Sequence, residues 1–224
     1  MGSISKSTLN FLVKLKQNNN RDWFNEHKPE FQIEQNNTKA FFESLQLELE
    51  KNDAIEKLKM FRIYRDVRFS KDKTPYKTHF SGGFVREGKE RRGGYYLHIE
   101  PKGSFLGGGF WNPNKDDLFR IRKEFEMDTS EIREIINEEN FVKYFGKLQG
   151  DSLKTAPRGF DKQHPDVDLI RMKQFIISRR FTDKEVLADD FLNEVEKSFR
   201  AMRPFFNYMS DVLTTNLNGE SIID

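Results

Sequence analysis

The sequence contains no cysteine among its 224 residues. This absence excludes disulfides, thiolate zinc sites, iron–sulfur clusters and thiol nucleophiles. No apolar run approaches the roughly 20 residues that a membrane helix requires, and the first residues lack the apolar core of a secretory signal peptide. We therefore expect a cytoplasmic protein that does not enter a membrane.

Apolar residues are also scarce, at 36% of the chain, while charged residues make up 33%. Aromatic residues compensate for this scarcity, because the chain has 22 phenylalanines, six tyrosines and two tryptophans. Each aromatic side chain buries about 150–250 Å². The composition therefore predicts a folded chain with a phenylalanine-rich core, and its length fits a single domain over residues 1–224.

The pattern of apolar residues predicts the α+β class. We expect residues 1–56 to be helical, residues 57–112 to form a sheet, and residues 113–224 to be helical with one further strand. Period-two alternation predicts strands over residues 61–69, 80–86, 94–100 and 104–111, and a further strand over 174–181. The short connections favour an antiparallel meander of four to five strands, flanked by N- and C-terminal helices.

Glycines 107–109 interrupt the fourth predicted strand. Glycine inside a strand is typical of a bulge or of a close approach by another backbone segment.

Positive charge is concentrated in one part of the chain. The net charge is only +2, but residues 57–92 contain 12 Lys and Arg residues against four Asp and Glu. Such a segment can concentrate positive potential on an anionic ligand. Lysines also protect exposed sheet edges from aggregation, so a solvated edge is the alternative interpretation.

The strand register predicts where a ligand would bind. In a strand over 61–69, polar side chains at even-numbered positions would share one face, which residues 94–100 would extend with their own polar side chains. Guanidinium groups on such a face can bind phosphate with two parallel hydrogen bonds. The candidate ligand-binding residues are Arg62, Arg65, Arg68, Lys73, Lys77, Tyr96 and Trp111.

Arg65 breaks this alternation, because it falls on the apolar face. A buried guanidinium requires a partner, so we expect Asp66 or Asp72 to hold Arg65, unless a bulge turns Arg65 toward a ligand. Arg68 and Lys73 should then remain available to an anion.

Two residues of the polar face are candidate catalytic bases, Asp66 and His98. His98 and Glu100 share a strand face and, with Asp66, form a conceivable metal-ligand set. A half-buried strand histidine that hydrogen-bonds a neighbour is the commoner arrangement, so we expect neither a metal nor another cofactor.

Three functions are compatible with these residues. The first is binding of an anionic, phosphate-bearing ligand such as a nucleotide, with nucleic acid as a weaker variant. The second is hydrolysis of a phosphate or acyl ester with Asp66 or His98 as base. The third is a protein–protein interaction module. A concave surface favours the first two functions and a flat, fully paired sheet favours the third, but the sequence predicts no oligomeric state.

Several motifs together resemble a known family. These are Asn-Asn-Arg-Asp-Trp-Phe at residues 19–24, Tyr-Arg-Asp-Val-Arg-Phe-Ser-Lys-Asp-Lys-Thr-Pro-Tyr-Lys at 64–77 and Tyr-Tyr-Leu-His-Ile-Glu-Pro at 95–101. With the glycines before Trp111 and Pro-Arg-Gly-Phe at 157–160, the chain resembles the family called domain of unknown function 2461 over nearly its whole length. Asp22 stands where that family leads us to expect Glu. The resemblance implies a cytoplasmic single-domain protein and carries no catalytic role.

Overall fold

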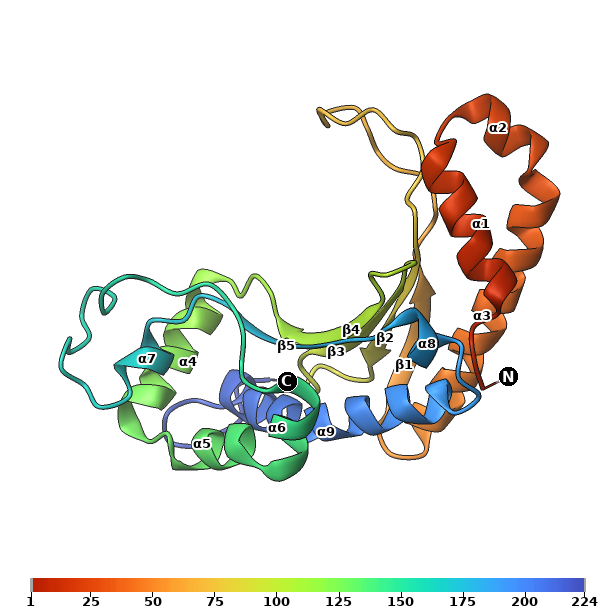
Figure 1. Ribbon diagram of the computed structural model, residues 1–224. Helices are drawn as coiled ribbons and strands as arrows, with labels where there is room; N and C mark the ends of the chain where they lie inside the picture. Colours follow the sequence, from red (N-terminus) through yellow and green to blue (C-terminus); the bar gives the residue numbers. More distant parts are fainter. Residues whose placement is uncertain (1, 224) are drawn as a thin grey trace. The chain divides into compact units, whose positions relative to one another are not determined.

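The structure is a computed structural model that describes residues 2–223. Five strands form one antiparallel sheet in the order β1-β2-β3-β4-β5, with helices before and after them in the chain (Figure 1). The strands are β1 Ile55–Met60, β2 Phe80–Arg86, β3 Gly94–Ile99, β4 Phe105–Phe110 and β5 Phe175–Arg180. The helices are α1 Lys6–Gln17, α2 Arg21–Glu26, α3 Lys28–Glu50, α4 Lys115–Met127, α5 Ser130–Asn137, α6 Glu139–Phe145, α7 Val167–Ile170, α8 Asp183–Val186 and α9 Phe191–Thr214. This arrangement confirms the α+β class.

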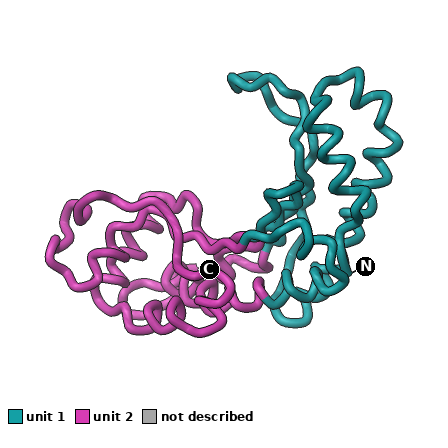
Figure 2. The backbone as a smooth tube through the Cα atoms, in the orientation of Figure 1, with its two compact units in different colours: residues 1–85, 96–106, 180–197 teal, residues 86–95, 107–179, 198–224 magenta. Residues whose placement is uncertain are grey.

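The chain divides into two compact units (Figure 2). The first unit comprises residues 1–85, 96–106 and 180–197, and the second comprises residues 86–95, 107–179 and 198–224. All the candidate site residues except Trp111 belong to the first unit.

Four of the five predicted strands are confirmed. The alternation over 80–86, 94–100, 104–111 and 174–181 corresponds to β2, β3, β4 and β5.

Among the described residues, none of the helices combines the length and the apolar character needed to cross a membrane.

The strand predicted over residues 61–69 is wrong. The first strand is β1, which ends at Met60, and residues 61–79 form a long connection to β2 that we call the basic loop (Figure 1). The alternating apolar residues of this segment do not form one buried face, because Ile63 is buried whereas Phe69 is 97% exposed. Only a short stem pairs, through the antiparallel bridge between Tyr64 and Tyr76.

Aromatic packing against the first helices fixes the stem of the basic loop. Phe24 of α2 is buried and stacks on Tyr76 with ring centroids 3.9 Å apart. Phe31 of α3 packs against Phe24 at 5.0 Å. Asn19 completes the attachment, since its amide donates to the Tyr76 carbonyl at 2.9 Å and its Oδ1 accepts from the Tyr76 N–H at 3.1 Å. The loop therefore leaves the sheet from a rigid base.

The turn between α1 and α2 follows from its asparagines. Asn20 has an extended backbone and its side chain accepts a hydrogen bond from the Trp23 N–H at 3.0 Å, which satisfies one free donor at the start of α2. Pro29 lies in the first turn of α3, where its missing N–H costs nothing. The Asn20 cap starts α2 directly after Asn19, which therefore lies in the same turn as Arg21.

In the second unit, the glycine run of β4 marks a close backbone approach, as predicted. Gly109 has φ of +116°, and a Cβ at this position would lie 2.1 Å from the carbonyl oxygen of Phe175 in β5. Glycine is required at this position because both the space and the dihedral exclude a side chain.

Candidate functional site

The basic loop is cross-linked by its own side chains. Arg65 pairs with Asp72, as one of the two predicted alternatives, and it also hydrogen-bonds the Thr74 hydroxyl and carbonyl. The Thr74 backbone N–H and the Arg65 guanidinium lower the pKa of Asp72 to about 2. Asp72 therefore remains ionised, and this cross-link remains intact, until the pH falls well below 3.8.

Arg68 is not free, contrary to the expectation from strand periodicity. Its Nε and Nη2 donate to the two carboxylate oxygens of Asp66 at 2.9 and 2.7 Å. Arg65 takes Asp72 as its carboxylate partner, and Asp66 pairs with Arg68 instead. The Arg68 guanidinium also lowers the pKa of Asp66, which makes this carboxylate a poor general base near neutral pH.

Lys73 is held in place without being neutralised. Its ammonium donates to the carbonyls of Val67 at 2.9 Å and Arg68 at 3.4 Å, and both acceptors are uncharged. Within residues 2–223, neither Arg62 nor Lys71 has an ion pair. The loop therefore retains positive charge after its internal pairs are formed.

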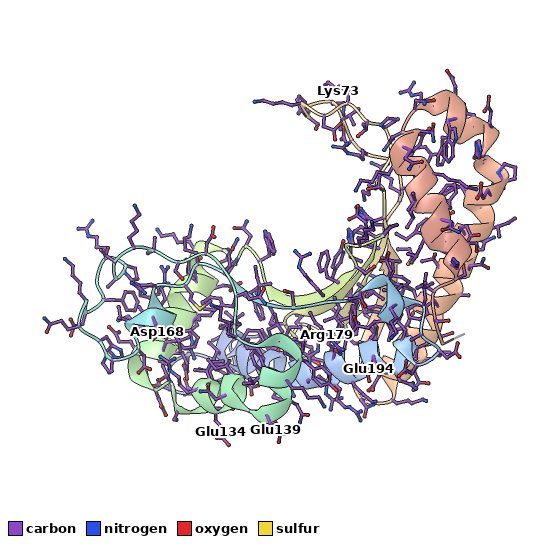
Figure 3. All side chains as sticks on the ribbon, viewed as in Figure 1. Lys73, Glu134, Glu139, Asp168, Arg179 and Glu194 are labelled. Carbon is purple, nitrogen blue, oxygen red and sulfur yellow. The ribbon has the colours of Figure 1, made fainter. Side chains whose placement is uncertain are left out.

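A hollow of about 460 Å³ lies between the α1–α2 turn and the basic loop. Figure 3 labels Lys73 on this loop. The residues that line the hollow are Asn19, Asn20, Arg21, Val67, Lys73, Thr74 and Pro75. The lining thus contains two cations and no carboxylate.

The Arg65 cross-link should protect the loop from proteolysis. We expect Arg65→Ala to accelerate chymotrypsin cleavage after the exposed Phe69, because Asp72 and Thr74 lose their shared partner. Arg68→Ala is the matched control, since its pair with Asp66 is more exposed and joins residues only two apart. Equal cleavage rates in the two variants would contradict the cross-link.

A second group of side chains lies on the sheet of the first unit, and we call it the histidine cluster: His79, Tyr96, His98 and Glu100. Tyr96, His98 and Glu100 alternate along β3 and just past its end, so they share one face. The Tyr96 hydroxyl lies 3.1 Å from His98 Nδ1, and His98 Nε2 lies 3.2 Å from Glu100 Oε2. His79, directly before β2, places its ring 4.0 Å from that of His98.

Burial sets the protonation states of the cluster. Burial and the neighbouring His98 lower the pKa of His79 to about 4, and burial also lowers the pKa of His98 despite the Glu100 carboxylate. Burial opposes ionisation of Glu100, but hydrogen bonds from His98 and Thr78 outweigh it, so the pKa of Glu100 is lowered. At neutral pH the cluster holds two neutral imidazoles and one carboxylate.

The structure separates residues that the sequence analysis placed on one surface. In the part of the chain that the structure describes, no hydrogen bond or ion pair joins Arg62, Arg65 or Arg68 to the histidine cluster. Among the candidate cations, Lys77 is the one near the histidine cluster, since its charge lowers the pKa of both His79 and His98.

The remaining differences concern single residues. Asp66, the third member of the metal-ligand set that the sequence analysis set aside, pairs with Arg68 in the basic loop. His79 takes its place beside His98 and was not among the candidates. The sequence did contain a signal for His79. It lies two residues before Ser81, so the alternating pattern of β2 places it on the same face as Ser81. Trp111 belongs to the second unit, where it is 69% exposed.

Comparison with known proteins places the chain in a family. Residues 7–208 match the family described as a conserved hypothetical protein, DUF2461. Searches of curated proteins and of solved structures found no significant match. Because the match covers most of the 224 residues, the chain belongs to the DUF2461 family.

Proposed function

We propose that this protein binds a phosphate-bearing ligand of nucleotide size in the hollow between the α1–α2 turn and the basic loop. The observation that carries the proposal is the composition of the lining, which includes Arg21 and Lys73 and no carboxylate. A volume of about 460 Å³ falls within the range of about 300–1,000 Å³ typical of small-molecule sites. This location replaces the predicted sheet face, because Arg62, Arg65 and Arg68 lie in the basic loop and not on a strand.

Arg21 and Lys73 are the residues that would contact the phosphate. The other polar side chains are already engaged: Asn19 binds Tyr76, Asn20 caps α2, and Thr74 hydrogen-bonds Arg65 and Asp72. These engaged residues form rigid walls. Lys73 is held by neutral carbonyls, so little side-chain entropy is lost when its charge meets an anion.

Thermal stability measured with added pyrophosphate and ADP tests the proposal. A ligand at 100 times its dissociation constant stabilises the folded state by about 2.7 kcal/mol. We expect Arg21→Ala and Lys73→Ala each to raise the ligand concentration needed for a given shift by about 10–100-fold, because a hydrogen bond to a charged group contributes about 1.5–3 kcal/mol. The effect should weaken at high salt.

Lys6→Ala is the control, because Lys6 is an exposed cation at the opposite end of α1, about 18 Å along the helix. Its ligand response should equal that of the natural sequence. An equal loss in all three variants would mean that only net charge matters and would contradict a site in the hollow. The absence of cysteine favours a cytoplasmic location, where nucleotides are available as ligands.

A further inference from the structure

The histidine cluster has the composition and spacing of a metal site. One nitrogen from each of His79 and His98 and one oxygen from Glu100 all lie within 4.8 Å of one another. We propose that these three residues bind a divalent transition-metal ion such as zinc. The assignment rests on different residues from the phosphate site, so either proposal can fail without the other.

The distances within the cluster fit coordination to a common ion. Two ligands about 2.1 Å from the same zinc ion lie about 3.0–3.4 Å apart, depending on the angle between them. His98 Nε2 and Glu100 Oε2 are already 3.2 Å apart. The three donor atoms lie within 4.8 Å of one another, so their separations have to shorten by at most about 1.8 Å. His79 and Glu100 can move because both are partly exposed.

Neighbouring groups orient the ligands as partners of a metal site do. A metal-binding histidine usually hydrogen-bonds through its second ring nitrogen, which fixes the ring and its tautomer. The Tyr96 hydroxyl occupies that position on His98, at 3.1 Å from Nδ1. Thr78 donates to Glu100 Oε1 at 3.0 Å, and Ser104 exchanges hydrogen bonds with the Glu100 backbone at 3.1 and 2.9 Å. Glu100 Oε2 is thus left to face the imidazoles.

The ligand types favour zinc or a similar ion. Two imidazoles and a carboxylate form a mixed nitrogen and oxygen set, which suits zinc, and three protein ligands leave at least one coordination position open. For Nε2 to bind the ion, the neutral His98 ring carries its proton on Nδ1, where the Tyr96 hydroxyl oxygen can accept it. Phe105 stacks on His98 with ring centroids 4.7 Å apart and covers one side of the site.

Two lysines also border the cluster. Lys16 Nζ lies 3.9 Å from Glu100 Oε1, the oxygen that does not face His98. Lys77 Nζ lies over the Phe61 ring, 5.6 Å from its centroid. These cations oppose the charge of a bound metal, but they would attract an anion that fills its open position.

Cobalt titration of the full chain tests the proposal, because the visible absorption of Co²⁺ reports both binding and ligand geometry. After treatment with a chelator, we expect the protein to bind one Co²⁺ per chain and to release it when Zn²⁺ is added. His79→Gln and Glu100→Gln should weaken binding by about 100-fold or more, whereas Tyr96→Phe should weaken it by about 10-fold. The chosen replacements keep side-chain size, and circular dichroism verifies that each variant folds.

His27→Gln and His164→Gln are the controls, because they remove the two histidines outside the cluster. Neither should change the spectrum or the affinity. Absence of cobalt binding by the folded natural chain would overturn the proposal and leave the cluster as a closed hydrogen-bond network. Binding that survives in His79→Gln and Glu100→Gln, or that is lost in a control, would overturn it equally.

Discussion

Phe24→Ala should lower the free energy of unfolding by about 3–5 kcal/mol, the usual cost of removing a buried phenylalanine. Phe24 is 1% exposed and contacts Phe31 of α3 together with both tyrosines at the stem of the basic loop, Tyr64 and Tyr76. Its removal leaves a cavity between the helices and the loop. Chemical denaturation monitored by circular dichroism measures the loss.

The same substitution should also loosen the basic loop. Because Phe24 supports Tyr76, we expect faster chymotrypsin cleavage after Phe69 under conditions in which the sheet remains folded. Phe69→Ala is the control for stability, since Phe69 is 97% exposed and its loss should change the free energy of unfolding by no more than about 0.5 kcal/mol. A similar loss in both variants would contradict the assigned packing.

Gly109→Ala should destabilise the protein by about 3 kcal/mol or more, which is among the largest effects of single substitutions. The new Cβ would lie 2.1 Å from the Phe175 carbonyl oxygen, and a backbone atom cannot move aside as a flexible side chain can. The φ of +116° adds strain for any residue other than glycine. Thermal unfolding followed by calorimetry measures the effect.

Gly146→Ala separates the two causes. Gly146 also has positive φ, at +72°, but a Cβ there meets no atom within 4 Å. We expect this control to cost only the dihedral strain, of the order of 1 kcal/mol. Equal losses in the two variants would show that β4 and β5 do not approach each other closely at Gly109.

Local alternation predicted most of the sheet because four strands combine a buried and a less buried face. Buried Tyr95 and Leu97 alternate with the partly exposed Tyr96 in β3, and this period is visible in the sequence. The same period failed over residues 61–69 because alternation reports the residue types but not whether a core is present to cover them. Phe69 has the residue type of a core position and is 97% exposed.

The partners of charged side chains were harder to predict than the strands. The sequence left Asp66 and Asp72 as equal candidates for Arg65, and only the loop conformation assigns Asp72 to it. Because Arg65 pairs with Asp72, Asp66 is the carboxylate that pairs with Arg68. The prediction that Arg68 stays free failed because it did not consider Asp66 as a partner of Arg68.

The hollow could not be predicted from local sequence at all. Arg21 lies on α2 and Lys73 on the basic loop, and no sequence period relates two positions that far apart. Their proximity depends on the two-point attachment of Asn19 to Tyr76 and on the stacking of Phe24. The proximity of His79 and His98 was easier to predict, because His79 lies directly before β2 and His98 lies on β3, the next strand of the meander.

Anomalous scattering from a crystal soaked in tungstate would locate an anion bound in the hollow. Tungstate is a tetrahedral oxyanion like phosphate, and its heavy atom can be located without ambiguity. We expect a peak in the hollow, within hydrogen-bonding distance of the Arg21 guanidinium and the Lys73 ammonium, that disappears in the Arg21→Ala, Lys73→Ala double variant. An empty hollow in the natural protein, or a peak that survives in the double variant, would contradict the proposed phosphate site.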